Sequence, residues 1–242
     1  MISIRPEASR EGTQGGFKAA LPLMLGRVVG FAATFFIPVI LARIFEPAQF
    51  GTYRQLFLIY GTLYGVAQLG MAESLLYFLP MARRHPGRYV TNATLVIGVT
   101  GLVCLLCLQE ARGTISRWLS NDALGNPLPL LGLFLLFMTF SAPLEILLIA
   151  QGRYGWAAVS YALSDILRAV LILLPALLLH SLAGLLLGAA VVAAARAVAL
   201  LLYLRREFPG DVRPDRALLK SQLAYALPFQ LVVILEALQT NF

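Results

Sequence analysis

Charged residues, cysteines and histidines are all scarce in this chain. Of its 242 residues, 13% are charged and 59% are hydrophobic, whereas a soluble domain carries about 25% charged residues. The mean hydropathy is +0.79. So few charges do not suffice to cover a water-exposed surface, and the composition therefore excludes an ordinary soluble domain. It predicts a protein that crosses a membrane several times.

The few cysteines and histidines exclude several kinds of site. Cys104 and Cys107 lie within one apolar stretch, with no second pair and no histidine beside them. We therefore expect two small buried residues there, and neither a metal site nor a redox motif. His85 and His180 are isolated near loops, so the sequence lacks the clustered histidines or aspartates of a lipid-modifying membrane enzyme. It predicts no catalytic residues, no metal and no cofactor.

Long apolar runs make up most of the chain. A hydrocarbon core about 30 Å thick requires ~20 residues of helix at 1.5 Å each, and seven stretches reach that length. The runs are continuous and rich in Leu and Ala, so they predict helices rather than the alternating strands of a barrel. We expect an all-α transmembrane fold with these seven helices: 17–44, 53–81, 89–109, 128–150, 155–179, 182–204 and 219–242.

The basic residues are distributed unequally between the two ends of these helices. The loops on the side of the N-terminus hold 12 of the 19 Lys and Arg residues, and the opposite loops hold 4. Basic loops stay in the cytoplasm, so we place the N-terminus of this multi-pass protein there. The net charge of +7 is then a signal of topology and does not indicate nucleic-acid binding.

A charged segment and a short internal sequence repeat divide the chain. The sequence Ala20-Leu21-Pro22-Leu23 returns 206 residues later as Ala226-Leu227-Pro228-Phe229. We therefore predict a cytoplasmic tail (1–16), a six-helix N-terminal lobe (17–204), a cytoplasmic linker (205–218) and the first helix of a truncated second lobe (219–242). On this interpretation the chain is part of a longer two-lobe protein. A complete seven-helix receptor or scaffold is the alternative.

Seven ionisable residues lie inside the apolar stretches: Arg27, Glu73, Glu145, Asp165, Arg168, Arg196 and Glu236. Each costs at least ~2.5 kcal/mol at the centre of a membrane helix, so they need a polar interior to face. Asp165 and Arg168 share one helix face and either neutralise each other or line a cavity. Arg196 and Glu145 lie near helix ends and are expected to reach water. Glu73 and Glu236 are either paired across helices or bind protons.

Two segments resemble a known family. The first runs from Ala42 to Tyr53, with Arg43 ending a helix, Pro47, and an aromatic-Gly pair before the tyrosine; the second is 68–75. Both are similar to bacterial polysaccharide and O-antigen flippases, the polysaccharide transporter branch of the multidrug/oligosaccharidyl-lipid/polysaccharide exporter superfamily. The resemblance covers roughly 17–100 and implies twelve to fourteen helices in two lobes around a central cavity.

The resemblance also implies a function. The protein would lie in the bacterial inner membrane. The substrate would be a polyprenyl-diphosphate-linked oligosaccharide, moved to the periplasmic leaflet by ion-coupled alternating access for lipopolysaccharide assembly. A polymerase and chain-length proteins would be partners. We expect Arg27, Arg168 and Arg196 to bind the diphosphate, because the guanidinium fork suits phosphate. The acids Glu73, Glu145, Asp165 and Glu236 would line the cavity or couple ions. A drug or toxin exporter of the same fold is the alternative, and three internal arginines favour an anionic substrate.

Other features of the helices have two interpretations each. Gly30 and Pro38 would let the first helix bend as a hinge. The alternative is that Pro38 has no functional role, because membrane helices tolerate prolines. Tyr53, Tyr60 and Tyr64 fall on one face of the second helix. That row suits sugar stacking, but helix packing is the simpler role for each ring.

Overall fold

The computed structural model describes residues 24, 28, 30–32, 35–82 and 84–241 of the chain. Within α10 it leaves out the side chains of Phe229, Val233, Ile234, Glu236, Ala237, Leu238, Thr240 and Asn241. An apolar helical segment, Gly30–Ile44, comes first. The elements that follow are α2 (Pro47–Ala67), α3 (Met71–Met81), α4 (Pro86–Glu110), α5 (Arg112–Trp118), the 3-10 turn η1 (Asp122–Leu124), α6 (Leu128–Ser141), α7 (Pro143–Ala150), α8 (Tyr154–Leu179), α9 (Leu182–Glu207) and α10 (Arg216–Asn241). All of these elements are helical, which confirms the predicted all-α fold for the described ranges.

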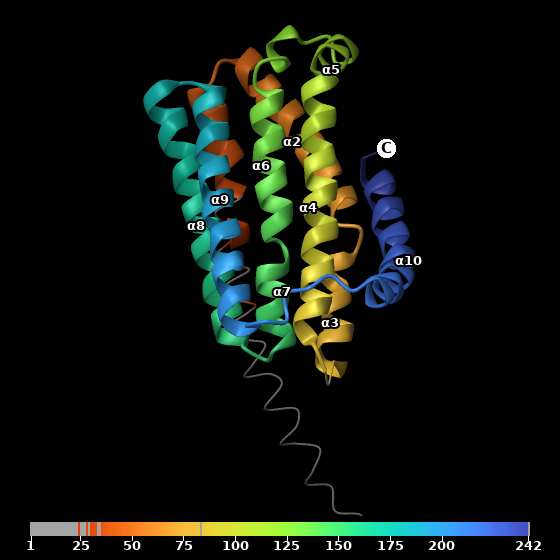
Figure 1. Cartoon of the computed structure of the whole chain (residues 1–242). Coiled ribbons are helices and arrows are strands. Elements are labelled where there is room, and N and C mark those ends of the chain that lie inside the picture. Colours follow the sequence, from red (N-terminus) through yellow and green to blue (C-terminus); the bar gives the residue numbers. More distant parts are fainter. Residues whose placement is uncertain (1–23, 25–27, 29, 33–34, 83, 242) are drawn as a thin grey trace, which may run out of the picture.

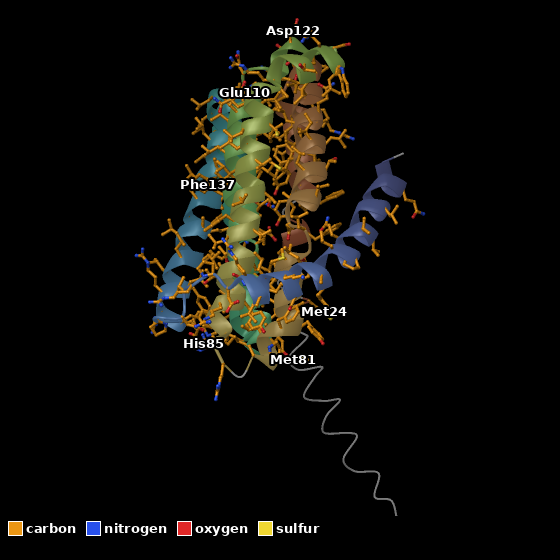
Figure 2. All side chains as sticks on the ribbon, turned by 45° about the vertical axis from the view of Figure 1, so that its right-hand side comes forward. Met24, Met81, His85, Glu110, Asp122 and Phe137 are labelled. Atoms are coloured by element: carbon orange, nitrogen blue, oxygen red, sulfur yellow. The ribbon has the colours of Figure 1, made fainter. Side chains whose placement is uncertain are left out.

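The helices form an elongated bundle (Figure 1), with α4, α6, α8 and α9 running along its length. Four described segments are long and apolar enough to cross a membrane: α4, α6 together with α7, α8, and α9. They match the predicted third to sixth spans. His85 and Met81 lie at one end of the bundle and Asp122 and Glu110 at the other (Figure 2). We call these the linker end and the α5 end.

The second predicted span differs from expectation. Helix α2 already begins at Pro47, where proline suits the first helical turn, so the segment expected to connect two helices is itself helical. The span then breaks, because Leu69 and Gly70 have φ of 49° and 63°. A Cβ on Gly70 would lie 2.8 Å from the carbonyl oxygen of Ala226 in α10, so only glycine fits this contact.

Side chains from other helices complete the broken end of α2. The last carbonyls of a helix lack partners within it. Thr100 Oγ1 donates to the carbonyl of Ala67 at 2.6 Å, and Gln230 Nε2 donates to that of Gly65 at 2.8 Å. The fourth span breaks too, between α6 and α7, where Pro143 has no N–H to continue the ladder. Both breaks are therefore built into the packing of the bundle.

The core follows the apolar faces of the helices. One cluster joins α2, α6, α8 and α9, and a second joins α3, α4, α7 and α9 with the start of α10. Along α2 the rings of Phe50, Tyr53, Phe57, Tyr60 and Tyr64 touch in sequence, with centroids 4.6 to 5.9 Å apart. This confirms the shared face of the three tyrosines.

One expectation about the cysteines is wrong. Cys104 is partly buried as a free thiol, but Cys107 is exposed on α4. Both belong to an apolar groove between α2 and α4. An outward-facing apolar position in a membrane helix needs no burial inside the protein, because lipid covers it.

The connection from α9 to α10 is held against the start of α4. Asp211 Oδ2 accepts from the backbone N–H of Gly87 at 2.9 Å. Asp215 Oδ2 pairs with Arg88 Nη1 at 3.2 Å, and its backbone N–H and carbonyl both bond the side chain of Asn92, at 3.0 and 2.9 Å. The connection is thus a fixed element at the linker end.

The charge of Asp215 makes this attachment depend on pH in one direction. Hydrogen bonds from the backbone N–H of Leu218, then from Arg88 and from the N–H of Ala217, hold the pKa of Asp215 below its usual 3.8. A carboxylate whose pKa is lower in the folded protein than in the unfolded chain stabilises the folded state at every pH above its unfolded pKa. This contribution is lost as the pH falls through the folded pKa. We expect the protection factors of the amides at the connection, which are the intrinsic exchange rates divided by the observed ones, to be constant between about pH 5 and 8 and to fall below about pH 3.8.

Asp215→Asn should loosen the connection at neutral pH. Removing the carboxylate charge weakens the pair with Arg88, and trypsin cleavage after Arg216, measured relative to the rate in the unfolded chain of the same variant, should become about two- to fivefold faster. Asp122→Asn, at the α5 end, is the control and should leave the cleavage rate unchanged. Equal cleavage in wild type and both variants would contradict the attachment.

Candidate functional site

A buried ion pair joins the fourth and sixth predicted spans. Arg196 Nη2 in α9 lies 2.8 Å from Glu145 Oε2 in α7, and the side chains are 12% and 2% exposed. Ser160 Oγ donates to the other Glu145 oxygen at 2.9 Å, and Arg196 Nε donates to Ser141 Oγ at 3.3 Å. The expectation that both charges reach water is therefore wrong. Glu145 lies in the first turn of α7, and the break before that helix places it between α8 and α9.

The second ion pair lies within α8. Arg168 Nη2 is 2.7 Å from Asp165 Oδ1, and the side chains are 20% and 23% exposed. The three-residue spacing predicted this pairing as one of two interpretations. Arg168 also lines a cavity of about 120 Å³ together with Tyr53, Tyr60 and Phe134. Arg168 thus faces the same cavity as the aromatic row of α2.

Two tyrosines of α2 lie within electrostatic range of residues of both pairs. The Tyr60 hydroxyl is within electrostatic range of Arg168, Arg196 and Asp165, and its ring stacks on Phe134 at 4.7 Å. The Tyr64 hydroxyl is within range of Arg196, Glu145 and Glu73. The ion pairs and tyrosines therefore form one polar interior, which we call the charged interior: Tyr60, Tyr64, Glu145, Asp165, Arg168 and Arg196.

Glu73 stands apart from the pairs. It lies in the first turn of α3, and its Oε2 is buried without a hydrogen-bond partner among the described residues. A buried oxygen of this kind is costly unless a partner satisfies it. The proton-binding interpretation of Glu73 stays a prediction, and pairing across helices is not seen in the described part of the chain.

The first helix comes close to the charged interior. A Cβ on Gly30 would lie 1.9 Å from Asp165 Oδ2, so glycine is what permits the contact. Pro38 is partly buried on the same segment. The hinge role of these two residues stays a prediction. Arg27 lies outside the described residues, and so does the side chain of Glu236.

Sequence reasoning missed the hydroxyls that complete the buried pair. Ser141 and Ser160 are short polar residues in apolar helices, and only their distance from Glu145 and Arg196 in space reveals their role. Among the described residues, no three His, Cys, Asp or Glu side chains come together as a metal-binding group. This arrangement can bind an anion, because an anion can replace the carboxylate as the partner of an arginine in an ion pair.

Comparisons with solved structures show a known fold. An outward-facing multidrug resistance MATE family transporter of the MOP superfamily superposes with a TM-score of 0.68 at 15% identity, over 90% of this chain and 52% of the other. A MOP superfamily transporter from Pyrococcus furiosus, described as having a binding pocket of reverse polarity that suggests a different function, gives 0.65 at 15% identity over the same shares. A MATE protein in complex with MaD5 gives 0.61 at 16% identity, over 88% and 52%. The chain spans about half the length of these proteins.

The sequence comparison gives the family. A search among curated proteins finds no match. The family model described as "Polysaccharide biosynthesis protein" matches residues 17–242, which confirms the resemblance seen in 42–53 and 68–75. The chain therefore belongs to the polysaccharide biosynthesis protein family and has the helical, multi-pass membrane fold of MOP superfamily transporters.

Proposed function

We propose that the full-length protein is a flippase for a polyprenyl-diphosphate-linked oligosaccharide. It would move this lipid from the cytoplasmic to the periplasmic leaflet of the bacterial inner membrane by alternating access. The family supports a role in polysaccharide biosynthesis, and the fold is that of transporters. A sugar headgroup with a diphosphate cannot cross hydrocarbon unaided, so such a pathway needs a protein with a polar interior.

The partly exposed Asp165–Arg168 pair is the observation on which the proposal depends. Its side chains keep about a fifth of their surface exposed, whereas Glu145 is 2% exposed and bonded to Arg196 and Ser160. A guanidinium fork binds phosphate oxygens with two hydrogen bonds, and phosphate would displace Asp165 as the partner of Arg168. The 120 Å³ cavity beside Arg168 is too small for the whole headgroup, so the rest would lie between this lobe and the second.

The two ion pairs would then have different roles. In the partly exposed pair, Arg168 exchanges Asp165 for the phosphate of the substrate. The released Asp165 carboxylate is then free to bind a proton or a cation, which couples transport to an ion gradient. Glu73, with its unpaired oxygen, is the second candidate for ion coupling. The enclosed Glu145–Arg196 pair holds α7 against α9. The unequal exposure of the pairs supports this assignment, and it narrows the diphosphate-binding set to Arg168 and the undescribed Arg27.

The division of the chain and its orientation belong to the same proposal. Residues 17–204 would form one lobe, 205–218 a cytoplasmic linker and 219–242 the start of the second lobe. The connection held by Asp211 and Asp215 lies at the end where basic loops predominate, which supports a cytoplasmic linker end. O-antigen or other lipopolysaccharide glycans would be the product, passed to a polymerase and chain-length proteins.

Arg168→Gln in the full-length protein should abolish most transport. Losing a charge-assisted hydrogen bond costs about 1.5–3 kcal/mol, so surface polysaccharide should fall by about tenfold or more while the lipid-linked oligosaccharide accumulates in the cytoplasmic leaflet. Arg168→Lys should retain part of the activity, because the charge remains without the fork. The measurement is the leaflet distribution of the lipid-linked glycan, with the abundance of each variant in the membrane measured alongside.

The double variant Arg168→Gln with Asp165→Asn separates folding from transport. It removes both charges, so neither partner is left unpaired in the interior. Its abundance should match wild type while its transport stays as low as in Arg168→Gln. Normal glycan transport in the double variant would overturn the role of Arg168.

An exporter of drugs or toxins is the second candidate function. It is favoured by the structural similarity to multidrug resistance transporters of the same fold. Deleting the gene and measuring both drug susceptibility and surface polysaccharide decides between the two. A fall in drug resistance with unchanged polysaccharide would favour export.

A further inference from the structure

The α5 end of the bundle carries a polar groove that lies apart from the charged interior. Its volume is about 630 Å³. The start of α2, the segment after α5 and the turn between α8 and α9 meet there, beside the position labelled Asp122 in Figure 2. Its polar lining residues include Gln49, Gln55, Asn121, Asn126, His180 and Ser181.

Amides, hydroxyls and an imidazole share the lining of the groove with apolar side chains, and the lining carries no fixed charge. Among the described residues that line it, none is Asp, Glu, Lys or Arg. A diphosphate or a charged peptide would lose its hydration there without an opposite charge in return. Amides and hydroxyls both donate and accept hydrogen bonds, which matches the paired hydroxyl groups of a neutral sugar.

Part of the lining is fixed by its own hydrogen bonds. Asn121 Nδ2 donates to Gln55 Oε1 at 2.6 Å and to Thr52 Oγ1 at 3.0 Å, while its Oδ1 accepts from the N–H of Ala123 at 3.1 Å. Gln49, Asn126 and His180 make no side-chain hydrogen bond within the described chain. The groove thus combines a rigid floor with polar groups that are available to a ligand, and little ordering is needed on binding.

Two residues of the lining have a strained backbone, which supports a functional role for their side chains. His180 and Ser120 have φ of 46° and 49°. His180 follows the last turn of α8, where its N–H bonds the carbonyl of Ala176 at 3.1 Å, a position that glycine usually occupies. A side chain in this conformation costs stability and tends to persist where it has a function. Here it places an exposed imidazole at the groove.

We propose that this groove binds a neutral sugar of the glycan headgroup at the periplasmic surface, after the headgroup has crossed the membrane. The inference rests on the proposed function for the source of the sugar, and on the loop charges for placing the α5 end in the periplasm. The groove holds the glycan at the exit, while the diphosphate stays at the level of the bilayer. The residues that recognise sugar identity are then distinct from the arginine that recognises phosphate.

The test uses the purified full-length protein in lipid nanodiscs and saturation-transfer NMR. The probes are short neutral oligosaccharides of glucose, galactose and mannose, with inorganic diphosphate as the charged probe. We expect saturation transfer to at least one sugar, and no competition from diphosphate. Gln49→Ala should weaken sugar binding about threefold to tenfold, the equivalent of one neutral hydrogen bond. Gln109→Ala, an exposed amide at the end of α4 outside the groove, should bind as wild type.

His180→Gly gives the sharper variant, because structural and functional roles predict opposite results. Glycine relieves the backbone strain, so the thermal midpoint should stay equal or rise, whereas sugar binding should weaken by the same three- to tenfold factor as in Gln49→Ala. A misfolded variant cannot produce this combination.

Each outcome bears on one proposal. No saturation transfer to any of the three sugars in the wild type would overturn the groove as a sugar site, as would unchanged binding in both His180→Gly and Gln49→Ala. Protection of a cysteine placed at Asn126 from a membrane-impermeant thiol reagent would show that the second lobe covers the groove, and would also overturn it. Sugar binding without any flipping of the lipid-linked glycan would instead overturn the proposed function and leave the groove in place.

Discussion

Arg196→Met should destabilise the protein by about 3–5 kcal/mol, because it leaves Glu145 charged and unpaired in the interior. Glu145 is 2% exposed, and after the substitution the Ser160 hydroxyl would be its one remaining partner among the described residues. Methionine replaces the bulk of the arginine stem, so the loss comes from the unpaired charge and not from an empty volume. Equilibrium unfolding of the full-length protein in detergent measures the change.

A matched pair on the surface is the control. Arg153 and Glu207 also join two helical segments, with Nη2 and Oε1 3.0 Å apart, but their side chains are 45% and 29% exposed. Solvent screens this pair, so Arg153→Met should cost less than about 1 kcal/mol. Adding Glu145→Gln to Arg196→Met removes the unpaired charge and should recover most of the lost stability. An Arg196→Met variant no less stable than Arg153→Met would show that the buried pair does not hold α7 against α9.

This result also decides whether Arg196 has a structural role or a role in transport. If the main loss is in folding, transport per folded molecule should be nearly normal in the charge-free double variant. Arg168 is expected to behave in the opposite way, with normal abundance and lost transport in its own double variant. The two arginines look alike in sequence, and the difference in the exposure of their partners separates them.

The features that the sequence predicted are local ones. Run length predicted the helices, and the third to sixth spans match α4, α6 with α7, α8 and α9. The Asp165–Arg168 pair was predictable because both residues lie on one helix face three positions apart. The shared face of Tyr53, Tyr60 and Tyr64 was predictable from helical periodicity in the same way.

The features that the sequence did not predict depend on contacts between distant parts of the chain. Glu145 and Arg196 are 51 positions apart, and nothing in either helix alone identifies the partner. The break at Leu69 and Gly70 depends on the close approach of α10. Apolar composition continues through that break, so hydropathy reads 53–81 as one helix. The groove at the α5 end is made by the start of α2 and two separate connections, none of which has a motif of its own.

Gly188→Ala is the substitution in the bundle for which we expect the largest steric effect. A Cβ at this position of α9 would lie 1.8 Å from the carbonyl oxygen of Leu171 in α8 and 2.8 Å from its carbon. Both neighbours are backbone atoms of a continuous helix, so no side-chain rotation relieves the overlap. The helices must move apart, and overpacking of this kind costs about 1–3 kcal/mol or more.

The displacement should also reach the charged interior. Helix α8 carries the Asp165–Arg168 pair and α9 carries Arg196, so separating the helices moves one ion pair relative to the other. We therefore expect Gly188→Ala to lower both the unfolding free energy and glycan transport per folded molecule. Gly155→Ala is the control, because a Cβ in the first turn of α8 meets nothing within 4 Å. It should be neutral or stabilise by up to about 1 kcal/mol, since alanine restricts the unfolded chain more than glycine. If Gly188→Ala instead behaved like Gly155→Ala, α8 and α9 could not be in backbone contact, and the geometry that places Arg168 relative to Arg196 would have to be wrong.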